Sequence, residues 1–333
     1  MNVATADVNI ANTAQAAAII AVVIPCYKVT RHVLGVIAAI GPEVTRIYAV
    51  DDACPEGSGD YIAEHCSDPR VKVLRHERNQ GVGGAVISGY QAALADNMDI
   101  VVKIDGDGQM DPALLPDFVA PIRAGEADYT KGNRFFDLEE IRQMPKARLI
   151  GNAMLSFMTK LSSGYWDLFD PANGYTAIHC SVLRRLPFAK ISRSYFFETD
   201  MLFRLNTLRA VAVDVPMHAK YADEVSNLKI SRIATEFLFK HVRNFGKRIF
   251  YNYYLRDMSL ASLELPLGLG LLTFGSIFGG YKWYASVQSG VPASLGTVML
   301  ASVSVLMGMQ FVLAFLAHDI ASTPRRVVHR RPQ

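Results

Sequence analysis

The strongest chemical signal in the sequence is the acidic segment DGDGQMDP at residues 105–112. Asp105 and Asp107 follow IVVKI, a run with the apolar, β-branched character of a buried strand. Two carboxylates at this spacing on a tight turn can reach one divalent cation, and glycines at positions 106 and 108 let the backbone fold around it. Hard oxygen ligands favour Mg²⁺ or Mn²⁺, which keep positions open for substrate phosphates. An EF-hand is excluded because Pro116 stands where that loop needs Glu.

Apolar runs alternate with helix-like segments along the first part of the chain. We expect strands at residues 19–24, 46–50, 71–74 and 100–104, and helices at residues 30–40, 58–65 and 82–95. This alternation predicts an α/β fold with a mostly parallel central sheet and helices on its faces. Ligands bind beyond the carboxyl ends of the strands in such sheets. Pro25, Asp51, Asp52 and Asp105 all stand at those ends, which predicts a single ligand site there.

The segment NQGVGG at residues 79–84 opens a predicted helix and could suggest a dinucleotide site. Its fingerprint is incomplete, because the third glycine would fall at Val86, and it follows the third strand rather than the first. We interpret the segment as a structural turn or as close packing near a nucleotide. The lysine of a phosphate-binding P-loop is also missing from the sequence.

Composition narrows the class of protein. The 333 residues are 50% hydrophobic with a mean hydropathy of +0.16, which is high for a wholly soluble protein. The 34 basic and 31 acidic residues leave a net charge of +3, so no global field favours nucleic acid as a partner. The 4 cysteines are far apart with no CxxC pair, which excludes a zinc ribbon or a dense disulfide scaffold and suits a reducing compartment.

Apolar residues concentrate near the C-terminus. Residues 283–317 contain no Asp, Glu, Lys or Arg, and residues 291–317 can cross a bilayer as a helix. Residues 265–281 form a shorter candidate span that residues 258–263 can extend. Basic residues precede the first span and follow the second, and we expect only Lys282 in the connection. The prediction is a two-helix hairpin with both ends cytoplasmic; a buried core helix is the alternative for each span.

Residues 235–257, just before the first span, form a separate element. Apolar residues recur there at helical spacing, and the basic residues Lys240, Arg243 and Lys247 mark another face. Such a helix is typical of an anionic membrane surface, although a packed surface helix with a solvated face has the same pattern. The N-terminus has no Lys or Arg before Lys28, unlike a signal peptide, so we expect residues 1–260 to stay cytoplasmic.

Seven segments together resemble the family 2 inverting glycosyltransferases with the GT-A fold, and among these the polyprenyl-phosphate sugar synthases of the dolichyl-phosphate mannose synthase type. They are VVIPCYK (22–28), VDDACPEGSGD (50–60), NQGVGGAVISGY (79–90), KIDGDGQMDP (103–112), KGNRF (131–135), FDPANGY (169–175) and FFETD (196–200). The likeness runs from about residue 18 to residue 230, and the two spans match the membrane-anchored branch. DDACPEG departs from the usual DDGS, and the extra length between Arg134 and Asp170 could be a membrane-facing insertion.

The resemblance implies a role for each matching residue. Nucleotide binding would involve Pro25, Tyr27, Asp51 and Asp52. Binding of Mg²⁺ or Mn²⁺ on the diphosphate would involve Asp105, Asp107 and Gln109. Contact with the sugar or the acceptor phosphate would involve Lys131, Glu198, Asp200, Lys229 and Arg232. Arg134 would neutralise one of the phosphate groups, and Asp170 would orient substrate, because a lipid phosphate is already anionic and needs no base. Surface solvation is the alternative for Lys131, and helix or turn capping for the acidic residues.

These inferences combine into a metal-dependent inverting glycosyltransferase that moves a sugar from a UDP- or GDP-linked donor to polyprenyl phosphate at the cytoplasmic membrane face. The alternatives are transfer to a hydroxyl of a lipid-linked glycan or polysaccharide, and a membrane-anchored binding module without catalysis. The expected organisation is an N-terminal extension (1–17), a GT-A domain (18–232), an amphipathic juxtamembrane helix (233–258), a transmembrane hairpin (259–319) and a basic cytoplasmic tail (320–333). Relatives suggest a homo-oligomer.

Overall fold

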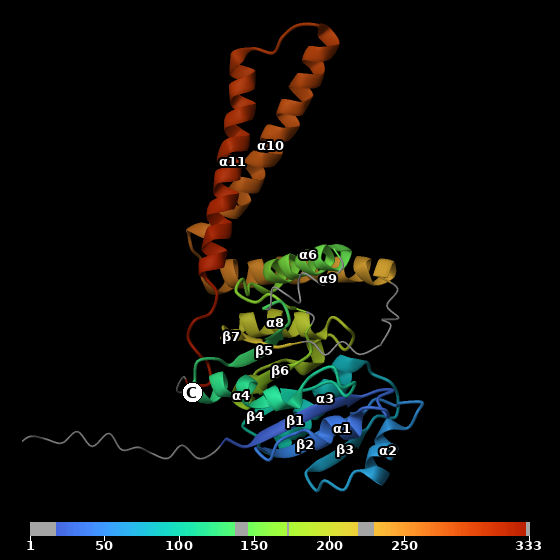
Figure 1. The fold of residues 1–333 in the computed structure, drawn as a ribbon. Coiled ribbons are helices and arrows are strands. Elements are labelled where there is room, and N and C mark those ends of the chain that lie inside the picture. Colours follow the sequence, from blue (N-terminus) through green and yellow to red (C-terminus); the bar gives the residue numbers. More distant parts are fainter. Residues whose placement is uncertain (1–17, 137–145, 172, 219–229, 331–333) are drawn as a thin grey trace, which may run out of the picture.

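The computed structural model describes residues 18–136, 146–171, 173–218 and 230–330 (Figure 1). Its strands form a 7-stranded sheet in the order β3-β2-β1-β4-β6-β5-β7. Their bounds are β1 Ile20–Cys26, β2 Val44–Asp51, β3 Val71–Arg75, β4 Ile100–Lys103, β5 Tyr129–Asn133, β6 Thr176–His179 and β7 Ala212–Pro216. Only β6 runs antiparallel to its neighbours, β4 and β5. The mostly parallel α/β sheet predicted from the sequence is confirmed, and so are the four strands predicted before residue 105.

Helices cover both faces of the sheet. The bounds in the soluble domain are α1 Val33–Ala38, α2 Ser58–His65, α3 Val82–Ala95, α4 Leu115–Ala124, α7 Cys180–Leu183 and α8 Phe197–Thr207. Alternate residues of β1 serve opposite faces: Ala21 and Val23 pack with α3, α7 and α8, whereas Val22 and Ile24 pack with α1, α2 and α4. A strand covered on both faces is apolar throughout, which is why the run at β1 could be recognised from sequence.

Two longer helices, α6 (Lys146–Ser163) and α9 (Ile230–Phe250), lie side by side between this domain and the C-terminal hairpin (Figure 1). The amphipathic helix was predicted at residues 235–257. Helix α9 begins five residues earlier and is followed by a π-helical turn, η3 (Tyr251–Arg256). Helix α6 falls in the extra length between Arg134 and Asp170. The layer that α6 and α9 form is called the platform below.

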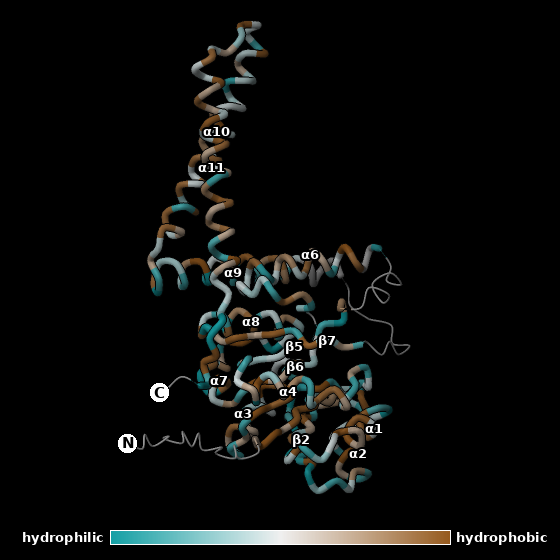
Figure 2. The backbone as a smooth tube through the Cα atoms, turned by 60° about the vertical axis from the view of Figure 1, so that its left-hand side comes forward, coloured by the Kyte–Doolittle hydropathy of each residue, from teal (hydrophilic) through white to brown (hydrophobic). Residues whose placement is uncertain are grey.

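The two apolar helices α10 (Leu260–Ser289) and α11 (Leu295–Ala321) pack against each other and stand away from the domain (Figures 1 and 2). Both are long and apolar enough to cross a membrane, and only 22% and 17% of their most apolar windows are buried, unlike core helices. Their length and exposure suggest membrane association. One expectation was wrong: Lys282 lies within α10, because that helix continues to Ser289, and the connection at residues 290–294 carries no charge.

A buried ion pair joins the hairpin to the platform. Arg248 of α9 lies 2.6 Å from Asp319 of α11, and both side chains are 2% exposed. Tyr253 of η3 and Trp166, just after α6, also donate hydrogen bonds to Asp319, at 2.6 and 2.9 Å. Three separate segments thus meet on one carboxylate. Removing one partner of a buried pair is strongly destabilising, so this junction fixes α11 against the platform.

The segment after α11 returns to the soluble domain. Asp128, beside the start of β5, is fully buried and accepts hydrogen bonds from the backbone N–H groups of Val211, Val328 and His329, and it contacts His329 Nδ1 at 2.7 Å. Val328 is 2% exposed and belongs to the main hydrophobic core. The predicted basic tail is therefore also a structural segment, although Arg325, Arg326 and Arg330 remain exposed.

We expect Asp128→Ala to lower the free energy of unfolding by about 3 kcal/mol, because three buried N–H groups lose their acceptor. Denaturation of the detergent-solubilised protein measures the change. Asp60→Ala is the matched control, since the Asp60 side chain is 73% exposed in a surface pair with Arg75, and should change stability by less than about 0.5 kcal/mol. Equal effects of the two substitutions would contradict a structural role for the tail.

Candidate active site

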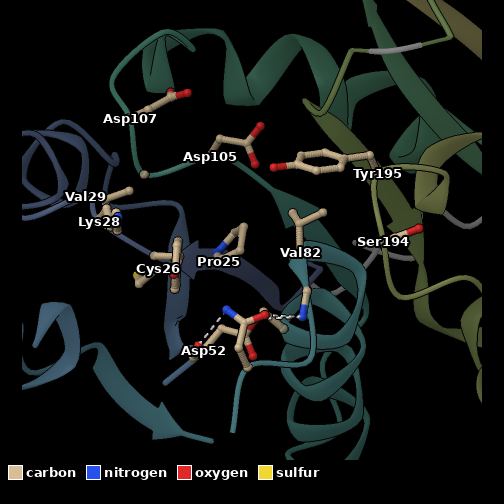
Figure 3. Close-up of a pocket in the computed structure, with 15 residues that line it drawn as sticks. Pro25, Cys26, Lys28, Val29, Asp52, Val82, Asp105, Asp107, Ser194 and Tyr195 are labelled. Carbon is tan, nitrogen blue, oxygen red and sulfur yellow. Dashed lines mark hydrogen bonds between the residues drawn. The ribbon is translucent and has the colours of Figure 1, made fainter. Parts of the chain in front are cut away.

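A cavity of about 610 Å³ opens at the carboxyl ends of β1, β2 and β4 (Figure 3). These three strands are parallel neighbours, so residues that follow them meet at one edge of the sheet. The polar and aromatic residues lining the cavity include Tyr27, Lys28, Asp52, Asn79, Asp105, Asp107, Ser194 and Tyr195. The single site expected at this edge is therefore present as a cavity.

Three of the four predicted nucleotide residues, Pro25, Tyr27 and Asp52, line the cavity, and Asp51 does not. The buried carboxylate of Asp51 accepts hydrogen bonds from the backbone N–H groups of Cys54 and Gly59, at 2.7 and 2.5 Å. It thus shapes the loop in which the sequence departs from the family pattern.

Asp52 holds the glycine-rich turn in place. Its carboxylate accepts hydrogen bonds from the backbone N–H groups of Gln80 and Gly81, both at 2.8 Å, and lies 2.6 Å from His76 Nδ1. The other ring nitrogen of His76 lies 2.7 Å from Ser88 Oγ on α3. Gly81 has φ +84°, and a Cβ there would collide with the carbonyl of Arg193. These contacts agree with the interpretation of residues 79–84 as a turn packed beside the site.

Asp105 and Asp107 both line the cavity from the turn after β4 (Figure 3). Asp105 Oδ1 is buried and makes no hydrogen bond of normal geometry, although the ammonium of Lys103 lies 2.9 Å away as an ion pair. A buried carboxylate oxygen in this state fits coordination of a hard cation. Gln109 does not line the cavity; its backbone N–H donates to Asp107 Oδ1 at 3.0 Å.

The oxygen atoms of the turn fit a cation that is bound partly by the protein and partly by the substrate. Among the described residues, no group of three His, Cys, Asp or Glu side chains could hold a metal ion by itself. Asp105 and Asp107 would supply protein oxygens, and diphosphate oxygens and water would supply the rest, as Mg²⁺ and Mn²⁺ sites commonly do.

Buried charges lie directly beneath the cavity. Lys103, at the end of β4, is 1% exposed and contacts Asp105 and also Glu198 of α8, at 2.9 and 3.2 Å. Burial alone would lower the pKa of Lys103, but Asp105 and Glu198 outweigh it and raise that pKa. Sequence analysis missed Lys103, although a lysine inside the apolar run IVVKI was a signal for a buried ion pair.

Lys131 is fully buried and donates a hydrogen bond to the carbonyl of Asn173. Burial lowers its pKa to about 8. Lys131 does not line the cavity where a phosphate contact was predicted. It is also not solvated at the surface, which was the alternative.

Arg134 and Asp170 do not line the cavity and form a two-pronged ion pair with each other. Arg134 Nε and Nη2 donate to the two carboxylate oxygens of Asp170, at 2.7 and 3.0 Å. Asp170 is 1% exposed, whereas the Arg134 side chain is 25% exposed. A carboxylate held in this way suits positioning better than proton abstraction.

Asp200, another predicted residue, does not line the cavity. Asp200 on α8 is buried and accepts hydrogen bonds from Ser192 N–H, Arg204 and Asn244 of α9, so it links α8 to the platform. Lys229 lies outside the described residues, and only the backbone of Arg232, in α9, is described. Tyr195, which sequence analysis did not select, is 66% exposed, and its hydroxyl points across the cavity toward Asp105 (Figure 3).

A model of glycosyl transferase family 2 matches residues 21–187, half of the chain and all the strands that form the cavity. The chain belongs to glycosyl transferase family 2. The resemblance drawn from the sequence motifs is thereby confirmed, and the protein is a glycosyltransferase of this family.

Two curated relatives match much of this glycosyltransferase. An undecaprenyl-phosphate mannosyltransferase from Micrococcus luteus is 32% identical over 200 residues, covering 59% of this chain and 81% of the relative. A polyprenol monophosphomannose synthase from Mycolicibacterium smegmatis is 28% identical over 202 residues, covering 59% and 75%.

Solved structures support the GT-A fold. A glucosyl-3-phosphoglycerate synthase from Mycobacterium tuberculosis, in complex with Mn²⁺, UDP-glucose and phosphoglyceric acid, matches with a TM-score of 0.53 at 18% identity, covering 69% of this chain and 80% of that one. A mannosyl-3-phosphoglycerate synthase from Rubrobacter xylanophilus matches with a TM-score of 0.52 at 18% identity, covering 73% and 77%. At this identity the likeness concerns the fold alone.

We expect Asp105→Asn and Asp107→Asn each to lower the rate of sugar transfer about 100-fold, because each would remove a charged ligand of the expected cation. EDTA should abolish transfer and added Mn²⁺ restore it. Asp68→Asn, in a surface pair with Arg70, is the matched control and should leave the rate unchanged. Transfer that survives both EDTA and the Asp105 substitution would contradict a metal site at this turn.

Lys131 should make stability depend on alkaline pH. Its lowered pKa of about 8 means that the folded protein binds fewer protons than the unfolded chain between about pH 8 and 10.5, so this group adds stability as pH rises, by about 1 kcal/mol per unit. Denaturation of wild type and Lys131→Met at pH 8, 9 and 10 isolates this contribution. Parallel stability curves for the two proteins would show that Lys131 does not titrate in this range.

Proposed function

We propose that this glycosyltransferase transfers a sugar from a UDP- or GDP-linked donor to polyprenyl phosphate, with inversion at the anomeric carbon. The observation that carries the proposal is the combination of a carboxylate-lined cavity with an apolar two-helix hairpin on one chain. The names of the M. luteus and M. smegmatis relatives support the same acceptor class. A lipid acceptor cannot leave the bilayer, so an enzyme held at the membrane meets it at high effective concentration.

The donor nucleotide would lie between Pro25, Tyr27 and Asp52, with its diphosphate at the turn of Asp105 and Asp107. A cation bound there neutralises the negative charge that appears as the nucleoside diphosphate departs. Tyr195, on the opposite wall, would limit the space beside Asp105 that is open to the sugar.

The acceptor phosphate would attack from the side opposite the diphosphate. Its oxygen is anionic at neutral pH, so the reaction needs orientation more than a base. Asp170, with its carboxylate held by Arg134, would provide a fixed polar wall, and the exposed part of Arg134 would meet the incoming phosphate.

The platform would lie against the lipid headgroups, with the soluble domain and both chain ends on the cytoplasmic side. It carries exposed apolar side chains on α6 and on α9, namely Ile150, Met154, Phe157, Leu238, Phe239 and Val242. Basic residues gather where the hairpin meets the domain, and Lys282 is the one charged residue near its far end. This asymmetry favours a cytoplasmic domain.

Purified full-length protein, incubated with Mn²⁺, a panel of UDP- and GDP-sugars and undecaprenyl phosphate, tests the proposal. We expect a polyprenyl-phosphate sugar, β-linked when the donor is α-linked, as judged by NMR of the anomeric carbon. A parallel reaction supplies a lipid-linked glycan as the acceptor. Turnover only with the glycan would contradict the proposal and favour transfer to a hydroxyl, and retention of the anomeric configuration would contradict inversion.

A further inference from the structure

A buried lysine lies between two carboxylates that approach the site from different parts of the fold. Lys103 ends β4, two residues before Asp105, and Glu198 lies in the first turn of α8. The ammonium of Lys103 is 2.9 Å from Asp105 Oδ1 and 3.2 Å from Glu198 Oε1. The lysine side chain is 1% exposed and that of Glu198 is 12% exposed. One charge therefore connects the turn that carries the metal-binding aspartates with helix α8.

The surrounding chain leaves this lysine little freedom to move. Lys103 pairs with Thr176 in the register of β4 and β6, which fixes its backbone in the sheet. A Cβ at Gly174 would collide with Lys103 Nζ and would lie 2.5 Å from Asp105 Oδ2. The backbone at Gly174, in the FDPANGY segment, thus packs against the ion pair, and a larger residue there would have to displace the ends of these side chains.

Stability alone is a weak reason for a lysine at this position. A buried ion pair is often no more stabilising than well-packed apolar residues of similar size. Lys103 does something that an apolar residue could not, since Asp105 and Glu198 would repel each other without a cation between them. The lysine offsets this repulsion between the two carboxylates.

Lys103 and a bound cation would compete for the negative charge of Asp105. When a divalent cation coordinates Asp105, the carboxylate is drawn toward the metal, and the attraction of Lys103 falls more strongly on Glu198. Without the cation, the lysine divides its attraction between the two carboxylates. The position of Glu198 would then respond to whether the metal and diphosphate are in place.

We infer that Lys103 is a positioning residue for the transfer reaction, which couples a cation bound at Asp105 to the orientation of Glu198 beside the sugar. The inference rests on the proposed function for its sugar-transfer readout. Its metal readout depends on the residues around Asp105 and on a bound nucleoside diphosphate, and not on the acceptor.

The test compares Lys103→Met, Lys103→Arg and Glu198→Gln in full-length protein, with Lys72→Met as the matched control. Lys72 is a half-exposed lysine on β3 that pairs with Asp96. Binding of Mn²⁺ in the presence of UDP and, separately, of GDP is measured from the EPR signal of the free ion, and kcat and KM are measured with whichever acceptor supports turnover. A melting temperature for each variant reports on folding.

Lys103→Met should bind Mn²⁺ at least 5-fold more tightly, because the competing ammonium is gone, and yet lower kcat at least 10-fold, because Glu198 loses its partner. Lys103→Arg keeps the charge, so its Mn²⁺ affinity should stay within 2-fold of wild type. Its kcat should lie between that of Lys103→Met and that of wild type. Glu198→Gln leaves the ammonium to Asp105 alone and should weaken Mn²⁺ binding at least 3-fold. Lys72→Met should change neither quantity.

A defect of folding would weaken both metal binding and turnover. Tighter Mn²⁺ binding together with a lower kcat in Lys103→Met therefore distinguishes a positioning role from a purely structural one. Weaker Mn²⁺ binding in that variant, or a kcat within 2-fold of wild type, would overturn the inference. If Lys103→Met fails to fold, a Glu198→Gln protein with unchanged Mn²⁺ affinity would overturn it instead. Mn²⁺ binding with UDP or GDP needs no acceptor, so failure of the proposed acceptor leaves this comparison intact.

Discussion

Negative charge gathered at one edge of the sheet is the constraint on which the rest of the site depends. Each carboxylate there is held by a different kind of partner. Asp52 is bound by backbone N–H groups and His76, Asp105 and Glu198 share Lys103, and Asp170 is bound by Arg134. Because unpaired buried charges are costly, these partners are as much a part of the site as the carboxylates. Asp105 Oδ1 makes no hydrogen bond of normal geometry but has Lys103 as its ion-pair partner, so a cation would enter the arrangement in competition with this lysine.

The same edge is connected to the platform through α8 and the residues before it. Arg193 bonds to Gln80 beside the cavity, and Phe196 packs edge-on against His241 of α9. Asp200 then bonds to Asn244, also of α9. One short stretch of chain thus forms the wall that carries Tyr195 and the attachment to the platform. The cavity cannot change shape on this side without involving a helix of the platform.

The part of the fold predicted from sequence is the part in which local pattern decides the outcome. Helices α2 and α3 have the predicted bounds, and the four strands before residue 105 were found because burial on both faces makes them continuously apolar. Side-chain direction was harder to predict: Asp51 and Asp52 are adjacent, and only the second lines the cavity, since neighbouring residues at a strand end point differently. Lys131 and Asp200 were selected by motif, but their burial depends on tertiary packing that spacing does not encode. The return of Val328 to the core is a contact between distant segments with no local signature.

Both ends of the hairpin are attached to the rest of the chain. Helix α10 follows the platform through η3, and α11 is held by Arg248 and Tyr253 at Asp319 and, through the segment after it, by Val328 at Asp128. A domain tethered by a single linker can swivel and drift away from the lipid, whereas two attachments suppress rotation and fix its tilt. In the proposed function, the catalytic edge would therefore keep a constant height above the headgroups. Diffusion of a long isoprenoid within the leaflet would become a two-dimensional search for a stationary target, and the enzyme would not need to bend toward its substrate.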